Sequence, residues 1–144
     1  MSLYEEHLYL SKSKIPGAGI GLFTDIDIPK GELILEYKGR LVLWKDVKHT
    51  DGYNAYLFKL NRTYAIDAKK YLKSFGRYAN DARGFSKITG LRNNSEYVTK
   101  KNKCYIKSIR KIHRGEEILV PYGKAYWDLI HKIKNEILLR NSRP

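Results

Sequence analysis

Most of the chain alternates between short apolar runs and polar turns. Ile, Leu, Val and Tyr are concentrated in the runs, where apolar and polar positions partly alternate, as is typical of strands. Gly, Pro and Asp-Gly interrupt the runs, for example at residues 29–31 and 51–52. The pattern predicts strands at residues 21–28, 32–39, 40–44, 53–60, 63–68, 95–100, 103–109 and 116–120.

The C-terminal segment follows a helical pattern instead. Its apolar side chains recur at helical spacing with Lys and Asn between them, at Tyr126, Leu129, Ile130, Ile133 and Ile137. We therefore predict an amphipathic helix at about 125–140 that packs on the sheet. Residues 74–94 are irregular and contain three glycines, and a loop of this length is often functional. The whole pattern predicts one mostly β domain, residues 1–144, of short antiparallel strands closed by one helix.

Composition restricts the class of protein. A length of 144 residues suits a single core, and 42% hydrophobic with 30% charged residues is typical of a globular chain. No apolar run approaches the roughly 18 residues of a spanning helix, and the N-terminus lacks the pattern of a signal peptide. We expect an intracellular protein, cytoplasmic or nuclear, that is neither secreted nor attached to a membrane. Cys104 is the only cysteine, which excludes a disulfide framework, and we expect no metal site.

The net charge of +13 is concentrated in one region. No acid occurs from Tyr97 to Gly115, and seven basic residues fall there: Lys100, Lys101, Lys103, Lys107, Arg110, Lys111 and Arg114. Such a stripe indicates contact with nucleic acid or another polyanion. A solvated face that keeps a small protein soluble explains it equally well.

Two short motifs carry candidate chemistry. Residues 17–21 read GAGIG, but Leu22 occupies the position of the third glycine of a dinucleotide loop, and a strand-like run follows where that motif needs a helix. Alternate glycines let the backbone approach a ligand closely, although a simple turn is as good an interpretation. Residues 76–84 read GRYANDARG, where an amide, a carboxylate and a guanidinium lie side by side. A surface turn is the simplest interpretation of that second stretch.

Four stretches in order resemble the SET-domain protein-lysine methyltransferases: SKIPGAGIGLFT, KGELILEYKG, YAIDAKKYLKSFGRYAND and IRKIHRGEEILVPYG. The resemblance covers about residues 8–127. It implies a SET-domain, β-clip-like fold with a knot-like crossing that brings Asn80 beside Tyr122. It also implies transfer of a methyl group from S-adenosylmethionine to the side-chain amine of lysine in a protein, a histone or another basic protein.

The resemblance also assigns roles to residues of this chain. Tyr122 matches the catalytic tyrosine, and Tyr37, Tyr97 and Val120 match positions around the channel for the substrate lysine. The cofactor-binding positions are Ala18, Gly19, Ile20, Gly21, Arg77, Tyr78, Asn80 and Asp81. The cysteines that bind zinc in many family members have no counterpart here. The C-terminal helix is therefore expected to complete the cofactor pocket, with Trp127 or Tyr126 against the adenine.

One position departs from the family pattern. Asp81 stands where most members have His, and residues 83–92 resemble an inserted basic loop. An aspartate here either braces the loop as the histidine does or weakens cofactor binding. The second possibility leaves an alternative function, a catalytically impaired SET-like module that contacts nucleic acid or chromatin through Lys100, Lys101, Lys103 and Lys107. A basic enzyme also repels a lysine-rich substrate unless a polyanion bridges the two or acids such as Glu32, Glu36 and Asp46 line the peptide groove.

Overall fold

The structure is a computed structural model that describes residues 3–84 and 88–141. The strands are β1 (Leu8–Lys12), β2 (Ile20–Thr24), β3 (Leu33–Glu36), β4 (Arg40–Leu43), β5 (Leu57–Lys59), β6 (Tyr64–Asp67), β7 (Ser95–Lys100) and β8 (Lys103–Ser108). The α-helices are α1 (Trp44–Val47) and α2 (Lys124–Asn141), and short 3-10 helices are η1 (Glu5–His7), η2 (Lys48–Thr50) and η3 (Phe75–Tyr78). The mostly β architecture with a C-terminal helix confirms the predicted fold class.

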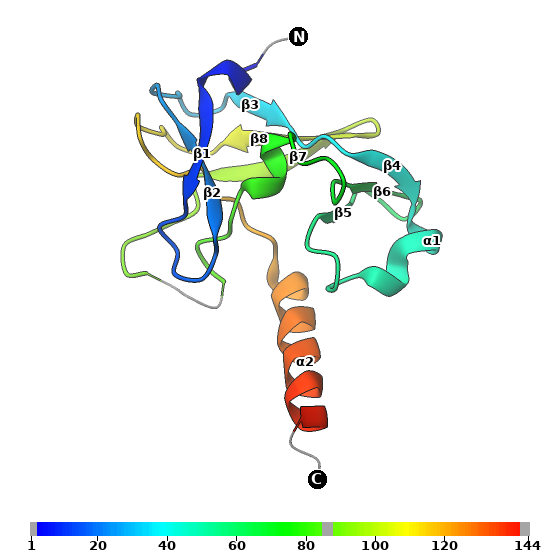
Figure 1. The fold of residues 1–144 in the computed structure, drawn as a ribbon. Helices are drawn as coiled ribbons and strands as arrows, with labels where there is room; N and C mark the ends of the chain where they lie inside the picture. Colours follow the sequence, from blue (N-terminus) through cyan, green and yellow to red (C-terminus); the bar gives the residue numbers. More distant parts are fainter. Residues whose placement is uncertain (1–2, 85–87, 142–144) are drawn as a thin grey trace.

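The strands form small antiparallel sheets that surround a common centre (Figure 1). β1 pairs with β2, β8 lies between β3 and β7, and β6 lies between β4 and β5. Ile66 in β6 pairs with Leu41 on one side and Phe58 on the other. In β8, Cys104, Ile106 and Ser108 are buried and alternate with more exposed side chains, as a strand with one face on the core requires.

The segment at 116–120, which we predicted to be a strand, is not one. It forms single bridges instead, an antiparallel one between Glu117 and Phe23 and a parallel one between Leu119 and Asn80. Val120 N donates to the Asn80 carbonyl at 2.9 Å, and Asn94 N donates to the Leu119 carbonyl at 3.1 Å. Because the segment shares its backbone groups among several neighbours, no continuous ladder forms. Its buried residues, 117–120, instead contact β2 and the segments that contain Asn80 and Asn94.

Local turns shorten two further predictions. Of the predicted strand at 53–60 only Leu57–Lys59 forms, since the N–H groups of Tyr53 and Asn54 both donate to the Thr50 carbonyl at 2.9 Å. The predicted strand at 40–44 stops at Leu43 because α1 begins there. β1 was not predicted. Only its first residue, Leu8, is buried, so the sequence of β1 does not show the alternation of apolar and polar positions that marks a strand.

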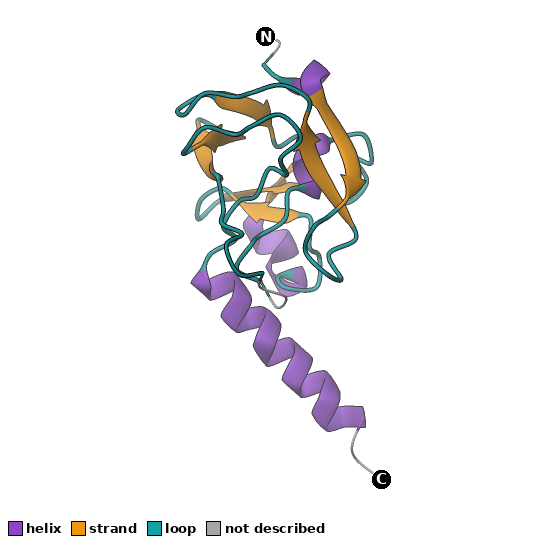
Figure 2. Ribbon diagram, turned by 90° about the vertical axis from the view of Figure 1, so that its left-hand side faces the viewer, coloured by secondary structure: helices purple, strands orange, loops and turns teal. Residues whose placement is uncertain are grey.

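Helix α2 forms where predicted but does not pack on a sheet. Figures 1 and 2 show it projecting from the body of the molecule. Its first turns contact the loop before β5, where a Cβ atom at Gly52 would lie 2.6 Å from Ile133 Cδ1. The side chains of residues 134–140 are exposed. In the part of the chain that the structure describes, no helix is both long enough and apolar enough to cross a bilayer.

Candidate active site

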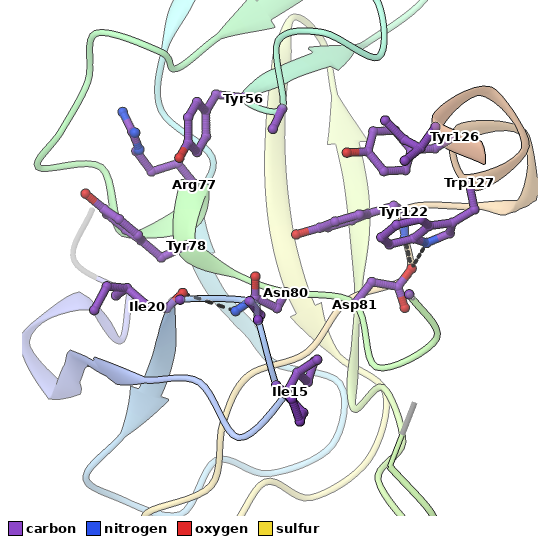
Figure 3. Close-up of a pocket in the computed structure, with 17 residues that line it drawn as sticks. Ile15, Ile20, Tyr56, Arg77, Tyr78, Asn80, Asp81, Tyr122, Tyr126 and Trp127 are labelled. Carbon is purple, nitrogen blue, oxygen red and sulfur yellow. Dashed lines mark hydrogen bonds between the residues drawn. The ribbon is translucent and has the colours of Figure 1, made fainter. Parts of the chain in front are cut away.

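Two cavities meet at Tyr122. The larger, about 740 Å³, lies between the glycine loop, the end of η3 and the first turns of α2 (Figure 3). The smaller, about 380 Å³, lies between β5, β7 and α2 and is lined mainly by aromatic and aliphatic side chains. Four residues contribute to both: Ala55, Arg77, Tyr122 and Tyr126. A group held in one cavity is therefore next to a group held in the other.

Glu117 fixes the glycine loop. The residue is 4% exposed, and its carboxylate accepts hydrogen bonds from Ser13 Oγ at 2.7 Å, Lys14 N at 2.9 Å and Asn80 Nδ2 at 3.3 Å. A Cβ atom at Gly21 would collide with this carboxylate, so the position requires glycine. The loop and the Asn80 segment are thus held by one buried acid.

Asn80 and Arg77 lie on the wall of the larger cavity. Asn80 Nδ2 also donates to the Ile20 carbonyl at 3.1 Å, which ties the segment after η3 to the glycine loop. Arg77 Nη1 donates to the carbonyls of Ala68 and Lys69 at 2.9 and 2.8 Å. Its guanidinium carbon lies 3.7 Å from the centre of the Tyr56 ring, a cation–π contact. In Figure 3, Tyr56, Arg77 and Tyr78 line one side and the aromatic residues of α2 the other.

Asp81 is the centre of a hydrogen-bond cluster that we call the Asp81 brace, the carboxylate and its four donors. One oxygen accepts from Arg83 N at 2.8 Å and from Asn93 Nδ2 at 2.9 Å. The other accepts from Tyr122 N at 2.9 Å and from Trp127 Nε1 at 2.7 Å. A carboxylate has about four acceptor sites, so the group is saturated although the residue is only 5% exposed. The brace joins the Asn80 segment to the Tyr122 segment and to α2.

Three aromatic rings pack against one another beside the Asp81 brace. Tyr122 stacks on Trp127, with ring centres 5.8 Å apart and planes 18° apart, and Tyr126 packs edge-on against both. The Tyr122 hydroxyl donates to the Ala79 carbonyl. A Cβ atom at Gly84 would lie 2.7 Å from the Trp127 ring, so this glycine makes room for the indole. The position of the Tyr122 hydroxyl is therefore fixed from both ends of the side chain.

The smaller cavity is a narrow aromatic space. The Tyr97 ring centre lies 4.7 Å from that of Phe58 and 6.1 Å from that of Tyr37. The Tyr37 hydroxyl donates to the Tyr56 carbonyl at 2.8 Å. Burial raises the pKa values of the Tyr37, Tyr97 and Tyr122 hydroxyls above the ordinary value for tyrosine. These phenols therefore stay neutral at physiological pH and serve as hydrogen-bond donors and packing surfaces.

The structure brings most of the predicted site residues together. The larger cavity is lined by Ala18, Gly19, Ile20, Arg77, Tyr78, Asn80, Asp81, Tyr122 and Trp127. Tyr37 and Tyr97 line the smaller one, again with Tyr122. Gly21 and Val120 line neither: Gly21 lies against Glu117, and Val120 is fully buried behind Asn80.

Sequence reasoning missed other residues of the site. Glu117 belongs to the Gly-Glu-Glu motif that carried the resemblance, so that motif could have pointed to it. Tyr56, Phe58, Asn93 and Asp51 gave no comparable signal. The acids suggested for a peptide groove, Glu32, Glu36 and Asp46, line neither cavity. Among residues 3–84 and 88–141 no group of three or more His, Cys, Asp or Glu is placed to hold a metal ion.

The chain is similar to known proteins in sequence. It is 31% identical over 119 residues to N-lysine methyltransferase KMT5A of Xenopus tropicalis, covering 76% of this chain and 34% of the relative. It is 32% identical over 119 residues to histone-lysine N-methyltransferase set-17 of Caenorhabditis elegans, covering 81% of this chain and 41% of the relative. The chain thus spans less than half the length of either relative.

Solved structures and a family model agree with these relatives. A structure of ctPRC2 in complex with H3K27me3 and H3K27M superposes with a TM-score of 0.65 and 25% identity, over 81% of this chain and 14% of that chain. The model of the SET domain family matches residues 19–123, from the glycine loop to the residue after Tyr122. Both cavities, the Asp81 brace and the bridge between Asn80 and Leu119 fall largely within that match, and the chain belongs to the SET domain family.

Proposed function

We propose that this protein transfers methyl groups from S-adenosylmethionine to the side-chain amine of lysine in a protein substrate. The observation that carries the proposal is that Tyr122 lines both cavities. One cavity suits a cofactor and the other is an aromatic space that suits an aliphatic chain ending in an amine. The relatives named above support the same reaction class.

The larger cavity fits the cofactor in size and in chemistry. Its volume of about 740 Å³ is within the range of small-molecule sites, and it combines apolar walls with a few fixed polar groups. Gly17 and Gly19 have φ of +80° and +74°, and no side chain of theirs blocks close approach to the loop backbone. We assign cofactor contacts to this loop, to Arg77, Tyr78 and Asn80, and to Trp127.

In this proposal α2 completes the pocket, and residues 1–144 act as a single SET domain. S-adenosylmethionine, when bound, supplies an electrophilic methyl group. The protein orients the reacting groups. The Tyr122 hydroxyl is held by the Ala79 carbonyl, and Tyr37, Phe58 and Tyr97 exclude water from the entering amine. Orientation of this kind lowers barriers by about 7–11 kcal/mol in favourable reactions. The lysine must lose its proton to solvent before transfer, since the neutral phenols are poor bases.

The rate of transfer is expected to rise with pH in a simple way. Free lysine has a pKa of about 10.4, so between pH 7 and 9 each pH unit raises the fraction of neutral amine about tenfold, and log kcat/KM by about one unit. Because burial raises the pKa of Tyr37, Tyr97 and Tyr122, no ionisation of these tyrosines adds a break in that window. Labelled-methyl transfer at constant ionic strength measures the slope, and a falling limb below pH 9 would contradict the assignment.

The raised pKa values of these tyrosines also set the highest pH at which the rate can be measured on a folded protein. A tyrosine whose folded pKa is raised contributes its full stability below the unfolded pKa of about 10, and this contribution is lost as the pH rises further. Circular dichroism at each pH should therefore show an intact fold up to about pH 9.5, and rates measured above that value should be discarded.

The test of the function itself is transfer of label from isotope-labelled S-adenosylmethionine to core histones and to a mixed protein lysate. A labelled protein band that disappears with excess unlabelled S-adenosylhomocysteine supports the enzyme, and peptide mapping then identifies the lysine. Calorimetry with the cofactor runs in parallel. Absence of both label and cofactor binding would refute the proposal.

A second candidate function rests on the basic hairpin, which we define as Lys100, Lys101, Lys103 and Lys107. The first three lie exposed at the β7–β8 turn, where Lys101 has a φ of 57°, and Lys107 follows on β8. We propose that this hairpin contacts nucleic acid, with or without turnover at the site. Either activity places the protein inside the cell, in the nucleus or cytoplasm.

Charge reversal tests this binding. A Lys100→Glu, Lys103→Glu variant should bind duplex DNA more weakly, and its plot of log affinity against log salt should be flatter by roughly 0.9 for each phosphate that the variant no longer neutralises. Fluorescence anisotropy between 50 and 200 mM salt measures the slope. A Lys132→Glu, Arg140→Glu variant, with both changes at exposed positions of α2, alters the net charge by the same amount and is the matched control. Equal slopes for the two variants would show that only net charge matters.

A further inference from the structure

The smaller cavity contains a single carboxylate among its described lining residues. Its charged residues are Asp51, Lys59 and Arg77, and the remainder are aromatic, aliphatic or alanine side chains. Asp51 lies in the turn before β5 and is partly exposed. It is also close enough to the cavity wall to raise the pKa of the Tyr126 hydroxyl, second to burial as a cause.

The simplest role for this aspartate, capping its own turn, does not apply. The turn is held by backbone groups: Tyr53 N and Asn54 N donate to the Thr50 carbonyl, and Asp51 N donates to the Lys48 carbonyl at 3.1 Å. Within the described residues, neither a hydrogen bond nor an ion pair to the Asp51 carboxylate is present. The carboxylate is therefore available to a ligand.

The two cations of the same cavity are engaged elsewhere. Lys59 Nζ lies 4.7 Å from the centre of the Trp44 ring. Arg77 is held by the Ala68 and Lys69 carbonyls and stacks on Tyr56. Neither forms an ion pair with Asp51 in the structure, so the negative charge at the cavity is not neutralised by a direct partner.

The position of Asp51 is also well defined. Gly52 follows it with φ of +81°, and Leu129 and Ile133 of α2 pack directly on this glycine. A side chain at position 52 would be strained at this φ and would collide with the Ile133 and Leu129 side chains, so glycine lets the turn pack closely on α2. The backbone of Asp51 is therefore placed at the side of the cavity where the turn meets α2.

We propose that Asp51 binds the ammonium group of the target lysine as it enters the smaller cavity, before the proton is lost. This inference rests on the proposed function. A chain of net charge +13 repels a cationic substrate at long range, and salt screens that repulsion beyond about 8–10 Å. A local carboxylate then selects the lysine at short range. Because it stabilises the ammonium form, Asp51 assists entry and selectivity and does not promote the chemical step.

The inference predicts a separation of KM from kcat. Asp51→Asn keeps the size of the side chain and removes its charge, so KM for a lysine peptide should rise on the order of 3- to 10-fold at low salt while kcat changes less than about twofold. The difference in KM should shrink as salt is added. Glu136→Gln, at an exposed acid on α2 outside both cavities, is the matched control and should leave KM unchanged.

A binding measurement separates this inference from the proposed function. Calorimetry compares a lysine peptide with one that carries norleucine, an uncharged isostere of the aliphatic chain, at the target position. Asp51→Asn should weaken binding of the lysine peptide by a similar factor and leave binding of the norleucine peptide unaltered. If both peptides lose affinity equally, or if Glu136→Gln has the same effect, the assignment to the target ammonium is wrong.

The remaining outcomes are also decisive. A wild-type protein that binds the lysine peptide no better than the norleucine peptide overturns the inference whatever its activity. A wild-type protein that prefers the lysine peptide through Asp51 but transfers no label supports the inference and refutes turnover alone. Equal unfolding midpoints for wild type and Asp51→Asn establish that the change is local.

Discussion

Replacing Tyr122 by phenylalanine is expected to reduce kcat for methyl transfer by on the order of 100-fold while the protein remains folded. Tyr122 lines both cavities, and its hydroxyl is fixed by the Ala79 carbonyl. Removal of one preorganised hydrogen-bonding group at a reacting centre typically costs a factor of about 10²–10³ in kcat. Its expected effect on the free energy of unfolding is about 1–3 kcal/mol, because the Ala79 carbonyl loses a partner.

Single-turnover transfer of labelled methyl groups measures this decrease, and thermal unfolding confirms the fold. Tyr126→Phe is the matched control, because Tyr126 lines the same two cavities and no described residue hydrogen-bonds to its hydroxyl. That variant should retain most of the rate. A Tyr122→Phe enzyme that keeps more than half of wild-type kcat, or loses no more than Tyr126→Phe, would remove Tyr122 from the chemistry.

Replacing Asp81 by alanine should lower the free energy of unfolding by about 3–5 kcal/mol. The Asp81 brace supplies the acceptor for four donors, and two of them are the backbone N–H of Tyr122 and the Trp127 indole. A buried donor left without a partner costs about 1–3 kcal/mol. Urea denaturation measures the change in stability, and cofactor binding should fall with it, since Trp127 and Tyr122 line the larger cavity.

Two variants sharpen the test. Asp46→Ala, at an exposed site, should change stability by less than about 0.5 kcal/mol. Asp81→His introduces the residue that most of the family carries, and a single imidazole cannot accept four hydrogen bonds. We therefore expect Asp81→His to be less stable than wild type and to bind the cofactor more weakly. Wild-type stability in that variant would show that the brace is dispensable in this chain.

The sequence predicted those parts of the fold that depend on local pattern. The alternation in β8 and the helical spacing of α2 each reflect one periodicity, and both elements formed near their predicted bounds. The resemblance to the SET-domain family implied that Asn80 and Tyr122 lie near each other. The parallel bridge between Asn80 and Leu119 is the contact by which the structure brings the two segments together.

Contacts between distant residues were beyond that reasoning. The sequence EEILV at 116–120 fits a strand, and nothing in it shows that its backbone groups would bond to several different segments. The four donors of the Asp81 brace come from three separate parts of the chain, and no spacing rule connects Asp81 with Trp127. The docking of α2 on Gly52, in place of a sheet, likewise depends on a turn whose conformation only the tertiary structure reveals.

The hydrogen bond between Ser13 and Glu117 joins residues 104 positions apart and has a consequence for biosynthesis. At a translation rate of about 5–20 residues per second, the glycine loop emerges from the ribosome several seconds before the residue that holds it exists. The loop can be held by this bond only after synthesis has passed residue 117. A nascent chain that stalls before Glu117 therefore has the sequence of the loop without the acid that holds it.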